Sequence, residues 1–372
     1  HRSIRWGAFT LREEIRFGVI GTGMMGIEHI ENLQLIEGNI VTAICDPNEG
    51  SLETANELTG GEADCFTNHQ ELLEKGKVDA LVVATPNMTH TEILIDVLET
   101  KIPVMIEKPL CTTAQECAEV ISAADDDAMV WVGLEYRYMP AVSELVKRVA
   151  EGIVGPVRMV SIREHRFPFL EKVENWNRFN SNTGGTLVEK CCHYFDLMHL
   201  ITKDLPVRVM ASGGQDVNHL DEKYGGEIPD IIDNAYVIVE FESGSRGMLD
   251  LCMFAEATRN QEEISVVGDL GKVEALVPES VIRTGIRGEH WIGSVEEEHS
   301  ENPEIMHEGL HSGASYIEHL RFREAFLQGT KPEVGLKEGF WSVAVGEAAQ
   351  LSIDRKSSVE IDEVIEGTGI NR

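Results

Sequence analysis

The sequence predicts a doubly wound parallel α/β sheet followed by a second, α+β domain with a large, mostly antiparallel open sheet. In residues 15–135, short runs of apolar, β-branched residues alternate with segments of helical periodicity. After residue 140, extended runs instead follow one another with little helix between them. The 372 residues are enough for two domains of ordinary size and a substantial core.

The first domain is expected to begin after a short N-terminal segment. Residues 1–14 contain three arginines but no apolar stretch typical of a signal peptide, and we interpret them as an arm or a cloning remnant. In residues 15–135, strands are predicted at 15–20, 40–45, 78–84, 103–106 and 129–133, and helices at 24–36, 52–58, 89–98 and 113–124. Parallel neighbouring strands require a crossover connection, so this alternation predicts a parallel sheet with helices on both faces.

Residues 136–372 form the expected second domain. A strand at 157–165 leads through an asparagine-rich loop to a helix at 186–201, and extended runs follow at 207–212, 234–242, 245–254, 262–267 and 272–276. Ser243 and Gly244 separate two of these runs, which predicts an antiparallel hairpin. Helices are predicted at 315–328 and 338–354, and the C-terminal helix is expected to pack back toward the first domain.

A glycine-rich turn joins the first predicted strand to the first helix. It consists of Gly21, Thr22, Gly23, Met24, Met25 and Gly26. Glycines at this spacing make a tight turn, let a pyrophosphate approach the backbone and allow close packing of helix and strand, while free N–H groups bind phosphate. Asp46 ends the second strand 20 residues after Gly26, where a carboxylate accepts hydrogen bonds from an adenosine ribose. We therefore predict a Rossmann domain that binds NAD rather than NADP, because a carboxylate repels a 2′-phosphate; the alternative is a merely tight turn beside a solvated Asp46.

Two polar clusters follow predicted strands at the carboxyl edge of the sheet, where ligands of open α/β sheets bind. The residues there that we assign to cofactor binding are Thr85, Pro86, Asn87, His90, Glu107 and Lys108. Pro109 restricts the residue before it and should hold Lys108 extended, with its ammonium in the cleft. Taken alone, Lys108 would be interpreted as an ordinary solvated lysine.

A third constellation lies in the predicted helix at 186–201. Glu189, His193 and Asp196 stand at positions i, i+4 and i+7, which places them on one helix face. A carboxylate on that face can orient the imidazole and tune its pKa. Taken alone, an acidic residue and a histidine at this spacing on a helix are more often solvent-exposed side chains without a catalytic role.

Together these motifs resemble the Gfo/Idh/MocA oxidoreductases, the family of glucose-fructose oxidoreductase and inositol dehydrogenase. The resemblance rests on the glycine turn, Thr-Pro-Asn-x-x-His at 85–90, Glu-Lys-Pro at 107–109 and Gly-Gly-x-x-x-acid-x-x-x-His-x-x-Asp at 184–196, in this order. It implies a nicotinamide-dependent dehydrogenase of a sugar, inositol or related polyol, with Lys108 and His193 as the catalytic pair and Glu189 in support. Glu189 is a departure, since family members more often carry Asp there. The resemblance also implies a homo-oligomer, either a dimer or a tetramer.

Oxidation of a secondary alcohol needs a base for the hydroxyl proton. His193 can serve as that base, or as the acid of the reverse reaction, near neutral pH. Lys108 would stabilise developing alkoxide charge and hold the substrate oxygen. Further polar side chains available as substrate contacts are Arg137, His165, Trp176, Arg178, Asn180, Asp196, His311 and Tyr316. No metal site is predicted, because His307, His311 and His319 lack an aligned carboxylate or cysteine partner.

Composition disfavours several other classes of function. Asp and Glu number 64 against 32 Lys and Arg, a formal charge of −32, which argues against nucleic acid and anionic lipid as partners. No apolar run approaches the ~20 residues that a membrane-spanning helix needs. Seven cysteines without a Cys-x-x-Cys pair indicate a reducing cytoplasm. Two alternatives stay open: a same-fold enzyme that retains NAD and cleaves a glycosidic bond by transient oxidation, and a non-enzymatic dinucleotide-binding regulator.

Overall fold

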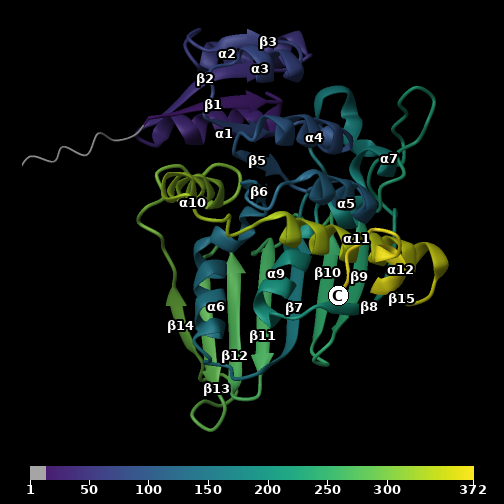
Figure 1. Ribbon diagram of the computed structural model, residues 1–372. Coiled ribbons are helices and arrows are strands. Elements are labelled where there is room, and N and C mark those ends of the chain that lie inside the picture. Colours follow the sequence, from purple (N-terminus) through teal and green to yellow (C-terminus); the bar gives the residue numbers. More distant parts are fainter. Residues whose placement is uncertain (1–13) are drawn as a thin grey trace, which may run out of the picture.

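Figure 1 shows the computed structural model, which describes residues 14–372. Residues 1–13, most of the expected N-terminal arm, lie outside the described residues. A six-stranded parallel sheet with helices occupies the upper part of the picture, and a nine-stranded sheet extends below it. Both sheets that the sequence predicts are therefore confirmed.

The first sheet is entirely parallel and has the strand order β3-β2-β1-β4-β5-β6. Its strands are β1 (Ile15–Ile20), β2 (Asn39–Cys45), β3 (Asp64–Phe66), β4 (Ala80–Val83), β5 (Val104–Glu107) and β6 (Val130–Gly133). The connections contain α1 (Met24–Leu35), α2 (Glu49–Leu58), α3 (His69–Lys75), η1 (Asn87–Thr89), α4 (His90–Thr100) and α5 (Ala114–Ala123). Strands β4, β5 and β6 are buried along their whole length, as expected for parallel strands covered on both faces. The strand order reverses between β1 and β4, which is where ligands of such sheets bind.

The second sheet is mostly antiparallel, in the order β14-β13-β12-β11-β7-β10-β9-β8-β15. Its strands are β7 (Val157–His165), β8 (Pro206–Gly214), β9 (Asn234–Phe241), β10 (Arg246–Cys252), β11 (Glu262–Gly268), β12 (Gly271–Val277), β13 (Val281–Ile286), β14 (Glu296–His299) and β15 (Val359–Glu360). β7 and β10 run parallel to each other. The predicted hairpin is confirmed, because β9 and β10 pair antiparallel with Arg246 opposite Glu240.

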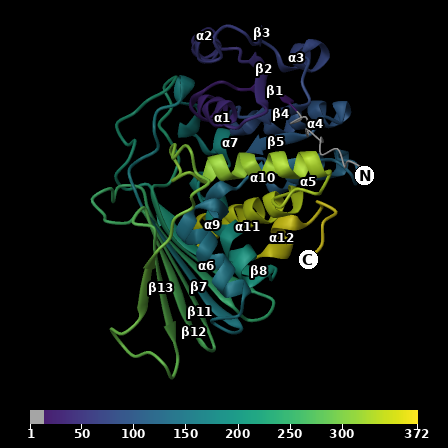
Figure 2. The same cartoon turned by 90° about the vertical axis from the view of Figure 1, so that its left-hand side faces the viewer.

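The second half of the chain contributes helices to the junction of the two sheets and to one face of the larger sheet. The helical elements are η2 (Glu135–Tyr138), α6 (Pro140–Ala150), η3 (Val173–Arg178), α7 (Asn180–Thr183), α8 (Thr186–Glu189), α9 (Cys192–Thr202), α10 (Ala314–Gln328), α11 (Leu336–Arg355) and α12 (Ile361–Ile365). Figure 2 shows α10 and α11 crossing the junction. The Ala114 N–H of α5 donates to Glu347 Oε2 of α11 (2.7 Å), and the Ala211 N–H of β8 donates to Ser352 Oγ of α11 (2.9 Å). Helix α11 thus ties both sheets together, while the expected domain boundary at residue 135 stays a prediction.

The helix predicted at 186–201 is wrong in detail. The segment forms two helices, α8 and α9, with a break at Lys190. In an unbroken helix the Glu189 carbonyl would accept the N–H of His193. Here that carbonyl accepts a hydrogen bond from Lys108 Nζ instead (3.1 Å). The break therefore offers a backbone acceptor to a side chain of the first sheet.

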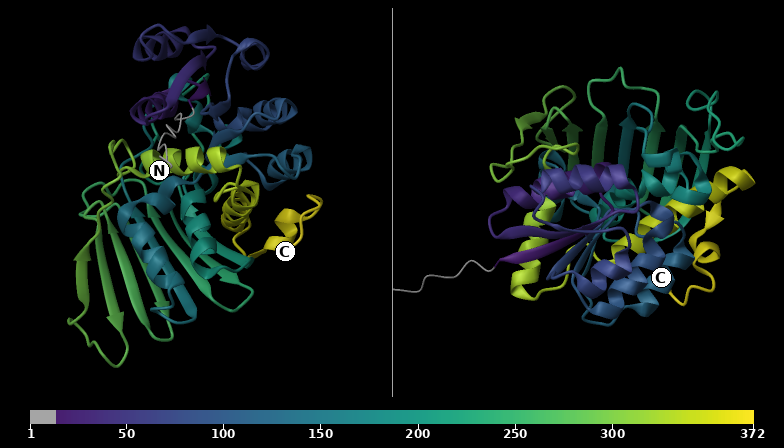
Figure 3. Two further views of the ribbon diagram at one scale, coloured as in Figure 1. Left: turned by 60° about the vertical axis from the view of Figure 1, so that its left-hand side comes forward. Right: turned by 90° about the horizontal axis from the view of Figure 1, so that it is seen from above.

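The nine-stranded sheet has one covered face and one open face. In Figures 2 and 3, α6, α9 and α11 lie on one side of it, and no helix within residues 14–372 covers the other side. Side chains along β9 alternate accordingly, with Tyr236 65% and Ile238 42% exposed between buried neighbours. Over the same described residues, no helix combines the length and apolarity that a bilayer crossing needs.

Candidate active site

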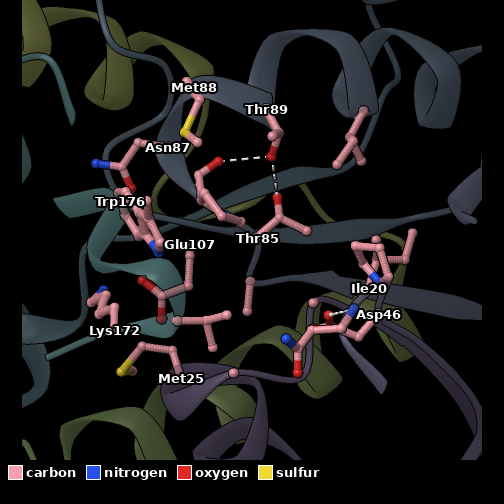
Figure 4. Close-up of a pocket in the computed structure, with 18 of the residues that line it drawn as sticks. Ile20, Met25, Asp46, Thr85, Asn87, Met88, Thr89, Glu107, Lys172 and Trp176 are labelled. Atoms are coloured by element: carbon pink, nitrogen blue, oxygen red, sulfur yellow. Dashed lines mark hydrogen bonds between the residues drawn. The ribbon is translucent and has the colours of Figure 1, made fainter. Parts of the chain in front are cut away.

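A cleft of about 910 Å³ lies at the carboxyl ends of the parallel strands. In Figure 4, Asp46 lies at one end of the cleft, and Glu107, Lys172 and Trp176 gather at the other. The predicted site residues that line it are Gly21, Gly23, Met24, Met25, Asp46, Thr85, Pro86, Asn87, Glu107, Lys108, Trp176 and Glu189. The structure thus brings most of the predicted cofactor residues, and two of the three predicted catalytic residues, to one cavity.

The three glycines of the turn differ in what an added Cβ atom would contact. Gly21 has a φ of +89°, and a Cβ there would lie 2.6 Å from the Ala84 carbonyl group. A Cβ on Gly26 would lie 2.0 Å from the Gly21 oxygen, so glycine is what lets α1 pack this closely on the turn. A Cβ on Gly23 would meet no atom within 4 Å, because that position faces open space in the cleft. The turn therefore leaves room for a pyrophosphate, as a dinucleotide site requires.

Asp46 is held by three hydrogen bonds from the chain. Thr22 donates to Oδ2 through its N–H (2.8 Å) and its hydroxyl (3.3 Å), and the Asn48 N–H donates to Oδ1 (2.8 Å). The carboxylate lines the cleft and keeps further lone pairs for a ribose. Two lysines and no arginine line the cleft among the described residues. Lys172 lies at the end opposite Asp46 in Figure 4, and Lys108 directly follows Glu107, which lies at that same end. The Asp46 end of the cleft fits an unphosphorylated ribose.

Side-chain contacts of Thr89 and His90 stabilise the turn at residues 85–90. Thr89 Oγ1 donates to Thr85 Oγ1 (2.8 Å), as Figure 4 shows. The His90 ring is fully buried, with Nδ1 2.8 Å from the Pro109 carbonyl oxygen and Nε2 3.0 Å from the Thr85 carbonyl oxygen. His90 was predicted to bind the cofactor, but it is not among the residues that line the cleft. It connects the loops that follow β4 and β5.

Glu107 and Lys108 lie at the end of β5. Glu107 Oε2 accepts the Lys108 N–H (3.0 Å), and its Oε1 lies 2.9 Å from Nε2 of His29, whose Nδ1 lies 2.8 Å from Nε2 of His319. Burial opposes the charge of Glu107, but the bonded His29 and the nearby Lys108 outweigh burial and lower the pKa of Glu107 to about 2. Burial also opposes the charge of Lys108, but the neighbouring Cys192 and Glu107 outweigh it and raise the pKa of Lys108. Lys108 is therefore a fixed cation in the cleft.

His193 on α9 is a buried, neutral imidazole. It is 1% exposed and stacks on Tyr136, with ring centroids 3.9 Å apart and planes at 9°. Its Nε2 lies 3.9 Å from Glu135 Oε1, and its Nδ1 has no hydrogen-bond partner among the described residues. Burial first, and then the positive charges of Lys108 and Lys190, lower the pKa of His193 well below its ordinary value. The ring is therefore neutral at neutral pH and keeps a lone pair that can accept a proton, although it is not among the residues that line the cleft.

The expected contact between His193 and a carboxylate of its own helix is wrong. Asp196 pairs instead with Arg137, whose Nε and Nη2 donate to its two oxygens (2.6 and 2.5 Å). Glu189 lies on the other side of the helix break, and its Oε2 has no hydrogen-bond partner in the described part of the chain. Burial raises the pKa of Glu189, against the opposing charges of the cleft lysines. The carboxylate that faces His193 is Glu135.

Sequence reasoning missed three side chains of this region, Glu135, Tyr136 and Lys172. Lys172 lines the cleft, and its Nζ lies 4.8 Å from the centroid of the Trp176 ring. Burial lowers the pKa of Lys172. Glu135 and Tyr136 directly follow β6, so the reasoning that singled out Glu107 after β5 would also have found them. Lys172 precedes the irregular turn η3 and carries no comparable signal.

Among the predicted substrate contacts, Trp176 lines the cleft and the other seven do not. Arg137 and Asp196 are buried in the ion pair described above, with side-chain exposures of 10% and 1%. Arg178 is 2% exposed, and its Nε donates to Glu222 Oε2 (2.9 Å). Because these polar groups are already satisfied within the protein, we do not propose them as substrate contacts.

The remaining candidates also lie outside the cleft. The N–H and Nδ2 of Asn180 donate to Asp230 (2.7 and 3.0 Å), and His165 Nε2 lies 3.1 Å from a carboxylate of β10. Tyr316 is buried in α10, and His311 lies in the loop before that helix, partly exposed. Across residues 14–372, no group of three or more His, Cys, Asp or Glu side chains has the geometry to hold a metal ion.

Both halves of the chain match families of known proteins. The matching models are described as "Oxidoreductase family, NAD-binding Rossmann fold", over residues 15–134, and "Oxidoreductase family, C-terminal alpha/beta domain", over residues 146–361. The chain is 28% identical over 360 residues to a myo-inositol 2-dehydrogenase of Thermotoga maritima, covering 94% of this chain and 100% of the relative. It is 23% identical over 385 residues to a 2,7-anhydro-N-acetylneuraminate hydratase of Escherichia coli, covering 96% of this chain and 100% of the relative. A solved levoglucosan dehydrogenase in complex with NADH shares the fold with a TM-score of 0.82, at 18% identity, over 94% of this chain and 99% of the other.

Proposed function

Because the chain belongs to the Gfo/Idh/MocA family of oxidoreductases, we propose that it oxidises a secondary alcohol of an inositol, a sugar or a related polyol, with NAD as the electron acceptor. The observation that carries this proposal is the position of Lys108, which lines the cleft and whose positive charge contributes to lowering the pKa of His193. The glycine turn and Asp46 line the same cleft. The dinucleotide site and Lys108 thus share one cavity, and His193, which does not line that cavity, is proposed to reach the substrate oxygen beside Lys108.

His193 is the proposed base. Its neutral imidazole would accept the proton of the substrate hydroxyl at Nε2, and would return that proton in the reverse reaction. The Lys108 ammonium, fixed by its hydrogen bond to the Glu189 carbonyl (3.1 Å), would hold the substrate oxygen and stabilise the negative charge that develops on it. When bound, NAD supplies the redox chemistry, because its nicotinamide ring accepts two electrons and a proton from the carbon. One proton is then left on His193 for each alcohol oxidised.

Asp46 is proposed to select NAD over NADP. We expect Asp46→Ala to lower the ratio of kcat/KM for NAD to that for NADP by about tenfold or more, because a charged hydrogen bond contributes about 1.5–3 kcal/mol and the repulsion of a 2′-phosphate also disappears. The ratio is measured with one polyol and both cofactors. Asp79→Ala is the control, since Asp79 pairs with Arg16 away from the cleft (2.7 Å). An unchanged ratio in Asp46→Ala would contradict the assignment.

A panel of inositols, aldoses and glycosides tests the class of reaction. With purified protein and NAD, we expect at least one polyol to yield NADH, measured by absorbance, and no glycoside to release its aglycone. The relative named 2,7-anhydro-N-acetylneuraminate hydratase supports a second candidate, a reaction on a glycoside or anhydro sugar without accumulation of NADH. Product without NADH would select an enzyme that retains its NAD. Tight NAD binding with neither product nor NADH would select a regulator.

We further propose a homo-oligomer, a dimer or a tetramer, in the cytoplasm. The open face of the nine-stranded sheet exposes the apolar side chains of Met159, Tyr236, Ile238 and Met248, and self-association would cover them. All seven cysteines are free, which supports a reducing compartment. The formal charge of −32 supports small molecules rather than nucleic acid or membrane surfaces as partners.

A further inference from the structure

A row of titratable side chains leads from His193 toward the surface. His193 Nε2 lies 3.9 Å from Glu135 Oε1, the same oxygen lies 3.5 Å from His311 Nδ1, and that nitrogen lies 3.8 Å from Glu28 Oε1. The side chains of His193 and Glu135 are 1% and 2% exposed, whereas that of His311 is 18% exposed. The row therefore begins at the proposed base and reaches solvent at His311.

Several polar atoms of this row lack a hydrogen-bond partner. Among the described residues, both oxygens of Glu135, Nδ1 of His193 and of His311, and Oε2 of Glu28 have no hydrogen-bond partner. An unpaired buried polar group costs roughly 1–3 kcal/mol, so several of them side by side call for an explanation. Glu28 Oε1 accepts the Leu310 N–H (3.2 Å), so α1 holds the loop that carries His311 against the row.

We propose that Glu135 and His311 form a proton relay from His193 to solvent. The proposal rests on the proposed function, because the relay needs an alcohol oxidation that loads a proton onto His193. The proton passes from His193 Nε2 to Glu135 Oε1 and then to His311 Nδ1, while Nε2 of His311 gives its own proton to water. No electron moves in these steps, and one proton leaves for each alcohol oxidised. Glu135 and His311 act through His193 and do not contact the substrate.

A neighbouring row of side chains does not offer the same route. Glu107, His29 and His319 are joined at 2.9 and 2.8 Å, but His319 is 1% exposed and its Nδ1 has no partner among the described residues, so this row ends inside the protein. With a pKa of about 2, Glu107 is also a poor proton acceptor. Burial raises the pKa of Glu135, which makes its carboxylate the better acceptor of the two.

Single-turnover kinetics separate the fate of the proton from that of the electrons. The protein is mixed with NAD and a polyol that it oxidises, and NADH absorbance and the colour of a pH indicator in weak buffer are recorded together. In the native protein we expect both signals to rise together. In Glu135→Gln and His311→Ala we expect NADH to form while proton release lags about tenfold behind it. His307→Ala is the matched control, since His307 lies in the same loop, 3.6 Å from Glu31 and outside the row, and it should behave as the native protein.

Two further readouts distinguish a relay from a structural role. Imidazole in the buffer should restore prompt proton release to His311→Ala, where the outer end is missing, but not to Glu135→Gln. In the protein without cofactor, Glu135→Gln should move the histidine ring-nitrogen resonances of His193 and His311 and leave those of His307 in place. Proton release in step with NADH in both variants, or His311→Ala without rescue by imidazole, would overturn the relay. Absence of NADH from the native protein with every polyol would instead overturn the proposed function.

Discussion

Lys108 follows β5 of the parallel sheet, whereas His193 lies on α9 in the second half of the chain, and the break between α8 and α9 brings the two regions into contact. The Glu189 carbonyl, which a continuous helix would use internally, accepts the Lys108 ammonium instead (3.1 Å). His193 follows the break and is fixed by its stack on Tyr136. The pair is thus held in place before any substrate arrives, which is the arrangement that stabilises developing charge most effectively.

Removal of either side chain should abolish most of the activity. We expect His193→Ala and Lys108→Ala each to lower kcat by about 10²–10⁴, because one loses the base and the other the cation at the substrate oxygen. NAD affinity of His193→Ala, measured by calorimetry, should stay within about threefold, since His193 neither lines the cleft nor belongs to the glycine turn. His299→Ala, a 56% exposed histidine of β14, is the control for a histidine lost elsewhere. Full activity in His193→Ala or in Lys108→Ala would refute the role of that residue.

For single residues, the sequence could predict a role where that role depends on the conformation of the local backbone. The positive φ of Gly21 and the contact of Gly26 with the Gly21 oxygen both arise within one turn, and Lys108 lies at the end of a single strand. The partner of His193 could not be read from its helix, because it comes from η2 and depends on the break at Lys190. Lys172 lies in an irregular loop, where neither periodicity nor a strand end marks it.

In the glycine turn, folding and cofactor binding depend on different glycines. Gly23 has φ −70° and ψ −160°, a conformation open to any residue, and a Cβ there would touch nothing. We therefore expect Gly23→Ala to melt within about 2 °C of the native protein but to bind NAD at least about tenfold more weakly, because the methyl group occupies the space of the pyrophosphate. Gly50→Ala in α2, also without a close contact, controls for the added methyl group. Unchanged NAD affinity in Gly23→Ala would contradict the placement of the dinucleotide.

Strands β7 and β11 place two buried carboxylates opposite each other, Glu164 and Glu262. Burial, and then the charge of Glu164, raise the pKa of Glu262 to about 7, from 4.5 in an exposed carboxyl. The folded state therefore binds more protons than the unfolded state between these values. The stability that this protonation contributes is complete below pH 4.5 and is lost as the pH rises through about 7.

Glu262→Gln should remove this pH dependence, because glutamine stays neutral. We expect the variant to be more stable than the native protein by on the order of 1–3 kcal/mol near pH 8, and the difference to shrink toward zero as the pH falls to about 4.5. Urea unfolding at a series of pH values measures it. Glu263→Gln is the matched control, because Glu263 is the next residue on β11, only half-buried, and pairs with Arg163. A difference that does not change with pH would contradict this explanation.

Among the strands and helices, those with a clear apolar pattern could mostly be predicted from the sequence, and those without one could not. Strands β1 and β5 are largely apolar and buried, and their predicted ranges lie within one residue of the observed ends. β14 is made of Glu296–His299, entirely exposed, and carries no apolar pattern. Helix α6 did carry a signal, since Pro140 opens it and Val142 and Leu145 are buried on one face, but it was not predicted.

For the whole molecule, the open sheet face predicts association. We expect light scattering after gel filtration to give a multiple of 41.3 kDa for the native protein and a reduced mass for Ile238→Lys, because a charge in the middle of an apolar contact is costly to bury. Leu327→Lys on α10 is the matched control, since both side chains are 42% exposed. Equal masses for the native protein and Ile238→Lys would exclude this face as the contact.

The alternation of strands and helices in the sequence was enough to predict the fold of each half of the molecule. It did not predict how the two halves are joined. Helix α11 hydrogen bonds to α5 through Glu347 and to β8 through Ser352. These contacts join positions more than a hundred residues apart, and no local pattern in the sequence encodes them. The cleft exists because α10 and α11 hold the second half of the chain against the parallel sheet.

The proposed function requires the dinucleotide and Lys108 to share one cavity, with His193 able to reach the substrate bound there. A crystal structure of the protein with NAD tests this most directly. We predict the pyrophosphate over Gly23, ribose hydroxyls on Asp46, and the nicotinamide ring beside Lys108 with His193 on the substrate side. NAD bound elsewhere with the glycine turn empty, or a nicotinamide out of reach of both side chains, would contradict the account.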